Sequence, residues 1–305
     1  MEIFTILAPI FLLIALGSAL QRTGFFGAGF LSGANKLTYW VGLPSLIVIS
    51  LMKADHSTVA VGGLLLTLVV GTLLSAGISW VTARAIGVKQ GVEGTWAQSA
   101  FRGNLVFVGL PVILTTPGLP VTAAILTLAP LLVVYNGLSV SLLLLSRHRG
   151  ADGVLRMVVK EIARNPIVVA SVAGAVAYLL NISVWVPVNR SIELVSRMAV
   201  PLALICIGGA LVNTPFRGNR RIAVCAALFK TAVSPLIGYG IGRLIGLGTP
   251  EMRVVLILMA CPTAAASYTM VRELGGDENV AASSIVMSTL FSMASLSIVL
   301  AATLE

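Results

Sequence analysis

Charged side chains inside the apolar stretches of this chain are few, and their signs suit an anionic ligand. Arg102 and Lys230 lie within such stretches, whereas no Asp or Glu lies at the centre of one and Glu193 comes closest. Ionisable groups are costly in hydrocarbon and usually functional. A site with cations and no carboxylates favours an anionic ligand. It also argues against a site of paired carboxylates, which would bind sodium or relay protons. The alternative is that Arg102 extends to the cytoplasmic surface and Lys230 caps carbonyls of a neighbouring helix.

Two asparagines are the strongest uncharged candidates for the same site. Asn104 and Asn136 lie in apolar stretches, where a buried amide must find partners and can donate N–H groups to a carboxylate. A purely structural hydrogen bond between helices is the alternative for either residue. Ser267 adds a hydroxyl in a later, interrupted stretch. The predicted substrate site therefore consists of Arg102, Asn104, Asn136, Lys230 and Ser267.

Residues that could support catalysis, a metal or a nucleotide form no pattern in the sequence. His56 and His148 lie in loops predicted on opposite sides of the membrane. Cys206, Cys225 and Cys261 lie in apolar segments without the paired spacing of a metal site. No Gly-x-x-x-x-Gly-Lys-Ser/Thr loop occurs, which excludes ATP-driven transport by this chain. We therefore expect no enzymatic activity, no cofactor and no metal.

The composition requires lipid as the solvent of the elements that carry these residues. Hydrophobic residues make up 57% of the 305 positions, charged residues only 10%, and the mean hydropathy is +1.01. A water-soluble domain of this size would precipitate with such a surface. The formal charge of +9 could suggest nucleic acid, but the basic residues are scattered at span ends without an aromatic-interleaved patch. They are topology signals, and no nucleic-acid partner is expected.

Apolar runs between polar breaks predict ten transmembrane helices, each of about 20 residues. The first run lacks a basic segment before it and a cleavage site after it, so we expect it to be retained as a span. The fourth and ninth runs are interrupted, at Phe101–Asn104 and at Cys261–Thr263. The predicted spans are 3–20, 33–52, 59–83, 95–114, 121–145, 163–180, 191–212, 221–243, 252–271 and 280–303.

The distribution of Lys and Arg predicts the orientation. Cytoplasmic loops carry an excess of these residues. The even-numbered loops hold only Lys53, Arg190 and Arg253, so the odd-numbered loops are cytoplasmic and both termini lie outside the cytoplasm. The odd-numbered loops hold Arg22, Arg84, Lys89, Arg147, Arg149, Arg156, Lys160, Arg217, Arg220 and Arg272. We expect a multi-pass protein of the inner membrane.

The two halves of the chain, 1–148 and 149–305, align as a repeat. At an offset of 157 residues, Pro9 aligns with Pro166, Gly17 with Gly174 and Pro44 with Pro201. Prolines are common in membrane helices, but three coincidences at one offset favour a true repeat. Five spans in each half make the second copy inverted, which is the architecture of many secondary transporters.

Prolines in the two interrupted spans indicate a binding site at the centre of such a fold. With a shorter later loop, Pro111 aligns with Pro262, and Gly109 precedes the first of them. Broken helices persist in a membrane only where they are buried or line a wet cavity, and their free N–H groups suit a carboxylate. Simple kinks are the alternative. Asn104 precedes Pro111 by seven residues, which is about two turns or roughly 10 Å from the break if the segment is helical.

Six short motifs are distributed along the whole chain. They are Gly-Leu-Pro-Ser-Leu-Ile at 42–47, Asn-Leu-Val-Phe-Val-Gly-Leu-Pro at 104–111, Tyr135-Asn136, Arg164-Asn165-Pro166, Cys-Pro-Thr at 261–263 and Arg-Glu-Leu-Gly-Gly-Asp at 272–277. None is specific alone, but in this order and spacing they resemble the auxin efflux carrier family, which includes plant carriers and bacterial transporters.

The resemblance implies an all-α membrane fold with ten transmembrane helices in two inverted five-helix repeats. Helices four and nine would be broken and would cross, as in bile-acid symporters. It implies a substrate site at Asn104 and Asn136, with crossover prolines at Pro111 and Pro262. The chain departs from the plant pattern at Ile167, at Ser267 and in its short central loop, so small carboxylates are a better expectation than auxin.

Three functions follow from these patterns. The first is a secondary carrier that exports small organic anions. The second is a sodium-coupled symporter, with sodium held by oxygens such as those of Asn104, Thr115 and Ser267. The third is a membrane receptor or channel without a transport cycle. The expected partners are a carboxylate substrate and the lipid bilayer. A homodimer is one of the possible assemblies.

Overall fold

The structure of the protein is a computed structural model that describes residues 2–27, 29–53, 61–147, 163–180, 182, 184–213 and 220–302. In these ranges every regular element is a helix, and there is no strand beyond one isolated bridge. Five helices are long and apolar enough to cross a membrane by length and composition, and shorter apolar helices accompany them. The protein is therefore an all-helical, multi-pass membrane protein, as the composition predicts.

Helices occupy each of the ten predicted ranges, and their bounds differ from the predicted edges by five residues or fewer. In the first half they are α1 (Glu2–Arg22), α2 (Phe30–Leu37), η1 (Thr38–Gly42), α3 (Leu43–Met52), α4 (Val61–Ala85), α5 (Glu93–Phe101), η2 (Leu105–Gly109), α6 (Leu110–Thr115) and α7 (Val121–Ser146). In the second half they are α9 (Pro166–Leu179), α10 (Val186–Asn213), α11 (Arg220–Leu228), η3 (Phe229–Val233), α12 (Ser234–Ile245), α13 (Thr249–Ala260), α14 (Ala266–Glu273) and α15 (Glu278–Ala301).

Three prolines widen a helix instead of ending it. The segments η1, η2 and η3 are π-helical, and each is followed by an α-helix whose second residue is a proline, namely Pro44, Pro111 and Pro235. A proline has no N–H to donate one turn back, and the preceding turn absorbs the misfit by widening. The chain therefore runs through Pro111 as helix.

The fourth and ninth predicted spans are interrupted where the sequence predicts, at Phe101–Asn104 and at Cys261–Thr263, and the chain is not broken at Pro111. Residues 102–104 separate α5 from η2, and residues 261–265 separate α13 from α14. Pro262 lies inside its break, whereas Pro111 lies seven residues beyond the other one. The predicted alignment of Pro111 with Pro262 is therefore wrong, because the two prolines do not occupy matching positions.

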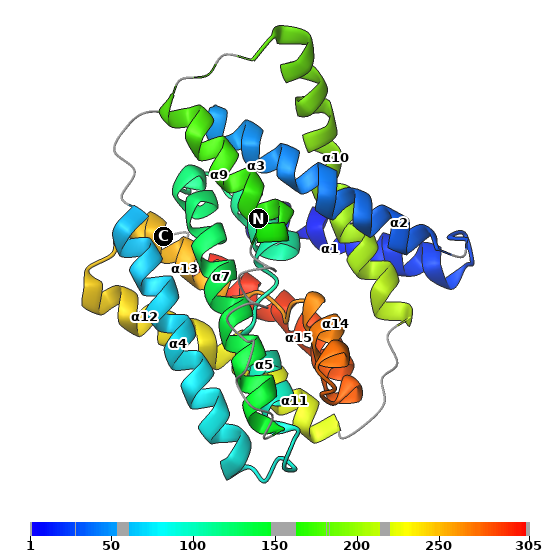
Figure 1. Cartoon of the computed structure of the whole chain (residues 1–305), viewed down its shortest axis with the longest axis vertical. Helices are drawn as coiled ribbons and strands as arrows, with labels where there is room; N and C mark the ends of the chain where they lie inside the picture. The colour runs from blue at the N-terminus through cyan, green and yellow to red at the C-terminus, as the bar shows by residue number, and fades with distance from the viewer. Residues whose placement is uncertain are drawn as a thin grey trace.

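The helices form two groups, which Figure 1 shows in different parts of the molecule. The packing group consists of α1, α2, η1, α3, α9 and α10, in which α1 packs along α10 and α3 packs against both α9 and α10. The crossover group consists of the remaining helices, with α4 against α5, α7 and α12, and α11 against α15. Contacts between α7 and α9 and between α1 and α15 join the two groups.

Large apolar side chains cover the outside of this assembly. Leu12 is 66% exposed on α1, Leu236 is 68% exposed on α12 and Leu244 is 89% exposed on the same helix. Such side chains are favourable against lipid tails, where they cost nothing to leave uncovered. Buried polar side chains, by contrast, include Arg102, Asn104 and Thr263 in the two breaks.

Candidate functional site

The two helix breaks pair with each other through their backbones. Gly103 and Thr263 form an antiparallel bridge. The N–H of Asn104 donates to the carbonyl of Pro262 at 2.7 Å, and the N–H of Ala264 donates to the carbonyl of Arg102 at 3.0 Å. We call these paired segments, 102–104 and 261–265, the crossover. Each break thus provides hydrogen-bond partners for backbone N–H and C=O groups that the other break leaves unpaired. Such pairing is needed because the hydrocarbon core of a membrane offers no water as a partner.

Small side chains and hydroxyls hold the crossover in place. A Cβ on Gly103 would approach the carbonyl oxygen of Leu258 to 3.3 Å and the Lys230 side chain to 3.1 Å, so the close approach favours glycine. Thr263 donates through its hydroxyl to the carbonyl of Ser99 at 2.7 Å and through its N–H to Ser288 Oγ at 2.9 Å. The crossover is therefore tied to α5 and α15.

Arg102 and Asn136, two predicted site residues, contact each other directly. The Arg102 guanidinium, only 6% exposed, donates to Asn136 Oδ1 at 2.7 Å and to Ser139 Oγ at 3.1 Å, both on α7. It also lies 3.4 Å from Met270 Sδ on α14. These three partner groups are uncharged. Arg102 does not extend to the surface, because its side chain is buried between α7 and α14.

Gln98 and Met270 belong to this cluster, although sequence reasoning missed them. Gln98 Nε2 donates to the Met270 thioether sulfur at 3.2 Å, so one sulfur receives hydrogen bonds from both Gln98 and Arg102. Helical spacing could have found both residues. Gln98 precedes Arg102 by four positions, and Met270 follows Ser267 by three, which places each pair on one helix face.

Lys230 lies on the other side of Gly103 and already has a backbone partner. Its side chain is fully buried, and Nζ donates to the carbonyl of Met259 near the end of α13. A cation at the C-terminal end of a helix is favourable because the free carbonyls carry partial negative charge. Lys230 therefore caps a neighbouring helix, as one of the two interpretations of its position expects.

Asn104 lies at the break itself and not two turns away. Its side-chain Oδ1 accepts a hydrogen bond from the N–H of Phe107 at 3.4 Å, which caps η2. Its backbone N–H pairs with Pro262, as described above. The prediction of a break at Pro111, two turns beyond Asn104, is wrong because the break lies at residues 102–104 and includes Asn104.

The remaining predicted residues have distinct places. Ser267 is fully buried in the first turn of α14, and its hydroxyl has no partner in the described part of the chain. Gly109 packs close to the second break, because an added Cβ would lie 3.0 Å from Cys261 Sγ. Thr115 is the last residue of α6, eleven positions after Asn104, and donates to carbonyls of its own helix.

Several other polar residues lie away from the crossover. His56 and His148 fall outside the described residues. Glu193 pairs with Lys53 at 2.8 Å and with Arg197 at 3.2 Å. Among the residues that the structure describes, no group of three or more His, Cys, Asp or Glu side chains could hold a metal ion.

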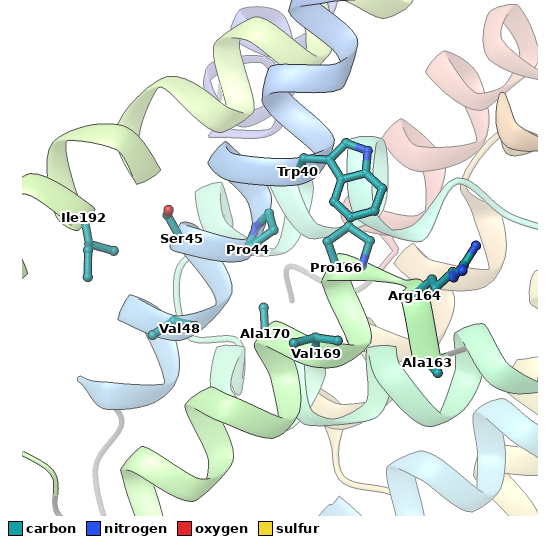
Figure 2. A pocket seen from close by; sticks show the side chains of 10 residues that line it. All are labelled: Trp40, Pro44, Ser45, Val48, Ala163, Arg164, Pro166, Val169, Ala170 and Ile192. Carbon is teal, nitrogen blue, oxygen red and sulfur yellow. The ribbon is translucent and has the colours of Figure 1, made fainter. Parts of the chain in front are cut away.

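An open groove of about 730 Å³ lies on the packing group and shares no residue with the crossover. Figure 2 shows the Trp40 ring next to Pro166, with Arg164 at one end of the groove and Ile192 at the other. Pro44, Ser45, Val48, Ala163, Val169 and Ala170 complete its lining. The groove is mainly apolar and lies apart from the buried polar cluster.

Paired helix breaks inside an apolar bundle, surrounded by buried polar groups, are typical of proteins that move solutes through membranes. The comparison with known families agrees. A family model described as "Membrane transport protein" matches residues 2–300, and the chain belongs to this family. The resemblance to auxin efflux carriers is thereby confirmed over nearly the whole chain.

Two relatives match over almost their full length. One, from Methanothermobacter thermautotrophicus, bears the name "Uncharacterized transporter" and is 27% identical over 292 residues, which cover 94% of each chain. The other, from Rhizobium meliloti, bears the name "Putative malonate transporter" and is 24% identical over 312 residues, which cover 96% of this chain and 93% of its own. Both names describe transporters, so a small-molecule substrate follows for this family.

Proposed function

We propose that the protein is a secondary active carrier that exports small organic anions, with its substrate site at the crossover. The observation that carries the proposal is the Arg102 guanidinium, buried beside paired helix breaks and held by the uncharged groups of Asn136, Ser139 and Met270. A guanidinium binds carboxylates through charge-assisted, often bidentate hydrogen bonds. The name of the Rhizobium meliloti relative, which specifies malonate, supports a carboxylate substrate.

The proposed architecture is ten transmembrane helices in two inverted repeats, 1–148 and 149–305. Glycine packing supports it. A Cβ on Gly17 would strike the backbone of Ile205, and a Cβ on Gly174 would lie 3.3 Å from the Cα of Val48. The offset of 157 that relates Gly17 to Gly174 also relates Val48 to Ile205. The two contacts are therefore the same contact with the halves exchanged.

The backbone pairing at the crossover supports the repeat in the same way. Asn104 donates to Pro262, and Ala264 donates to Arg102. An offset of 160 converts the first bond into the second, since it relates Asn104 to Ala264 and Arg102 to Pro262. The helix pairs α1 with α10 and α3 with α9 are related by the same exchange. An inverted repeat of this kind suits alternating access by movement of the packing group against the crossover group.

The membrane placement is part of the proposal. The protein lies in the inner membrane with both termini outside the cytoplasm, because Lys and Arg are concentrated in the odd-numbered loops. Reporter fusions to each terminus, one active only in the cytoplasm and one active only outside it, test this orientation. Cytoplasmic activity at either terminus would reverse or invalidate it.

Exchange in proteoliposomes tests the function. Vesicles with the purified protein are loaded with an unlabelled carboxylate, and uptake of the same labelled compound is measured across a panel of mono- and dicarboxylates. We expect saturable counterflow for at least one small carboxylate. Uptake that lacks counterflow would instead indicate a channel, and a requirement for sodium over potassium would indicate a sodium-coupled symporter. No exchange across the panel by folded protein would overturn the proposal.

A further inference from the structure

Three buried polar atoms beside the Arg102 cluster have no hydrogen-bond partner in the described part of the chain. They are Gln98 Oε1 on α5, Ser267 Oγ on α14 and Ser284 Oγ on α15. All three residues are fully buried. Leaving a polar atom both buried and unpaired is costly, so proteins rarely keep several together without a function.

Helical register brings these three atoms to the same level of the bundle. Ser267 lies between Ala264, which pairs at the crossover, and Met270, which contacts Gln98. Ser284 precedes Ser288 by one turn, and Ser288 contacts the crossover residue Thr263. The helices α5, α14 and α15 all pack against one another. The three unpartnered atoms therefore lie one turn from the crossover, on the side where α14 begins.

The orientation of the Gln98 amide is fixed by its sulfur contact. Nε2 donates to the Met270 thioether, which accepts hydrogen bonds but cannot donate them. The opposite flip would set two acceptors against each other. Oε1 is therefore the amide atom left without a partner, and it requires a partner with an O–H or N–H group.

The requirement limits which chemical group can complete the site. A carboxylate has only acceptors and would repel Gln98 Oε1, while an ammonium group would add positive charge beside the Arg102 guanidinium. A hydroxyl donates to Oε1 and can also accept from Ser267 or Ser284. Because Gln98 and Arg102 share Met270 Sδ as a partner, one small molecule can reach both.

We infer that Gln98, with Ser267 and Ser284, forms a hydroxyl-selective subsite next to Arg102, so that the carrier prefers short hydroxycarboxylates over carboxylates without the hydroxyl. The inference rests on the proposed function, because Arg102 must bind the carboxylate of the same molecule.

Matched substrate pairs test the subsite. Binding of lactate against propionate, and of malate against succinate, is measured by titration on the purified, full-length protein. We expect the hydroxylated member of each pair to bind about tenfold more tightly. In Gln98→Met, which keeps the side-chain length but removes the acceptor, the two members should bind equally. The adjacent Ser99→Ala is the matched control, since its hydroxyl donates within its own helix and the preference should persist.

Two further variants keep the test decisive if Gln98→Met folds poorly. Ser267→Ala and Ser284→Ala remove hydroxyls that have no protein partner to lose among the described residues, so each should fold and should reduce the preference several-fold. Equal binding of both pair members by the wild type, or an unchanged preference in all three variants, would overturn the subsite while leaving the carrier intact. Failure of every carboxylate to bind folded protein would instead remove the proposed function.

Discussion

The packing group and the crossover group bury different kinds of side chain. Among the described residues, the packing group buries only three polar side chains, the small hydroxyls of Thr38, Ser171 and Ser196. Each of them donates to a carbonyl of its own helix. The crossover group buries a guanidinium, an ammonium and several amides. In the described part of the chain, the buried charged and amide side chains therefore lie in the crossover group alone.

The difference extends to how the helices touch. In the packing group α1 and α10 approach until Gly17 and Gly208 leave no room for a Cβ, and Ser18 Oγ donates to the carbonyl of Gly208 at 2.8 Å. In membranes, such contacts between small residues hold helices together through close van der Waals packing. The comparison shows that the helices of the packing group associate tightly, whereas those of the crossover group enclose charged and amide side chains.

The largest expected effect comes from removing a charge in the crossover group, compared with removing one next to the packing group. Arg102→Gln removes the buried guanidinium, and we expect carboxylate affinity to fall by about 30-fold or more, since losing one side of a buried charged contact costs about 2–5 kcal/mol. The matched control is Lys53→Gln next to the packing group, which removes an exposed charge paired with Glu193. Titrations of both folded variants against one carboxylate check this, and similar losses in both would contradict the division between the groups.

The second expected effect is on stability, and here the substitution in the packing group should have the larger effect. Gly208→Ala places a methyl group against the carbonyl of Ile14, a backbone atom that cannot move aside, so the free energy of unfolding should fall by about 1–3 kcal/mol. Gly77→Ala on α4 is the control, because nothing lies within 4 Å of its added Cβ. Thermal unfolding in detergent measures both.

Ligand affinity supplies the second measurement for these glycine variants. The fraction of Gly208→Ala that stays folded should bind carboxylates as the wild type does, since the crossover group is unchanged. Equal stability of the Gly208 and Gly77 variants would show that α1 and α10 can separate without cost. Weaker binding by folded Gly208→Ala would show that the packing group shapes the site.

The extent of each helix and the positions of the two breaks could be predicted from the sequence, but the pairing of the breaks could not. Apolar runs have lengths set by the bilayer, so their edges were predicted within five residues. Pro111 carried the wrong signal, because a proline in a helix can be accommodated by a π-turn such as η2. The polar residues at 101–104 marked the break itself, but its backbone pairing joins it to residues 262–264, which are far away in sequence.

The site was predicted unevenly for a similar reason. Residue types alone identified Arg102 and Asn136, because a charge or an amide in hydrocarbon stands out. Gln98 and Met270 were missed, since a lone Gln or Met in an apolar run is common and only the fold brings both to Arg102. Lys230 stood out equally, but only the structure reveals its carbonyl partner, Met259.

The smallest expected effect compares two asparagine caps, one in each group. Asn104 caps η2 at the crossover, with 3.4 Å between Oδ1 and the N–H of Phe107, and Asn165 caps α9 in the packing group, with 2.9 Å between Oδ1 and the N–H of Ile167. An Asp keeps the accepting oxygen and an Ala loses it. At both positions the Ala variant should therefore be the less stable, by about 0.5–2 kcal/mol, with the smaller loss at Asn104 because its bond is longer.

The substrate affinities of these variants should differ in another way from their stabilities. The affinities show whether Asn104 only caps η2 or also faces the substrate. Asn104→Asp places a negative charge at the crossover, so carboxylate binding should weaken at neutral pH and partly recover at lower pH as the new carboxyl takes up a proton. Asn165→Asp should change affinity little at any pH, because α9 lies in the other group. Titrations across pH, normalised to folded protein, compare the two Asp variants. An equal response of both would mean that Asn104 caps η2 without facing a ligand, and the site would then be confined to Arg102, Asn136 and the α14 side of the crossover.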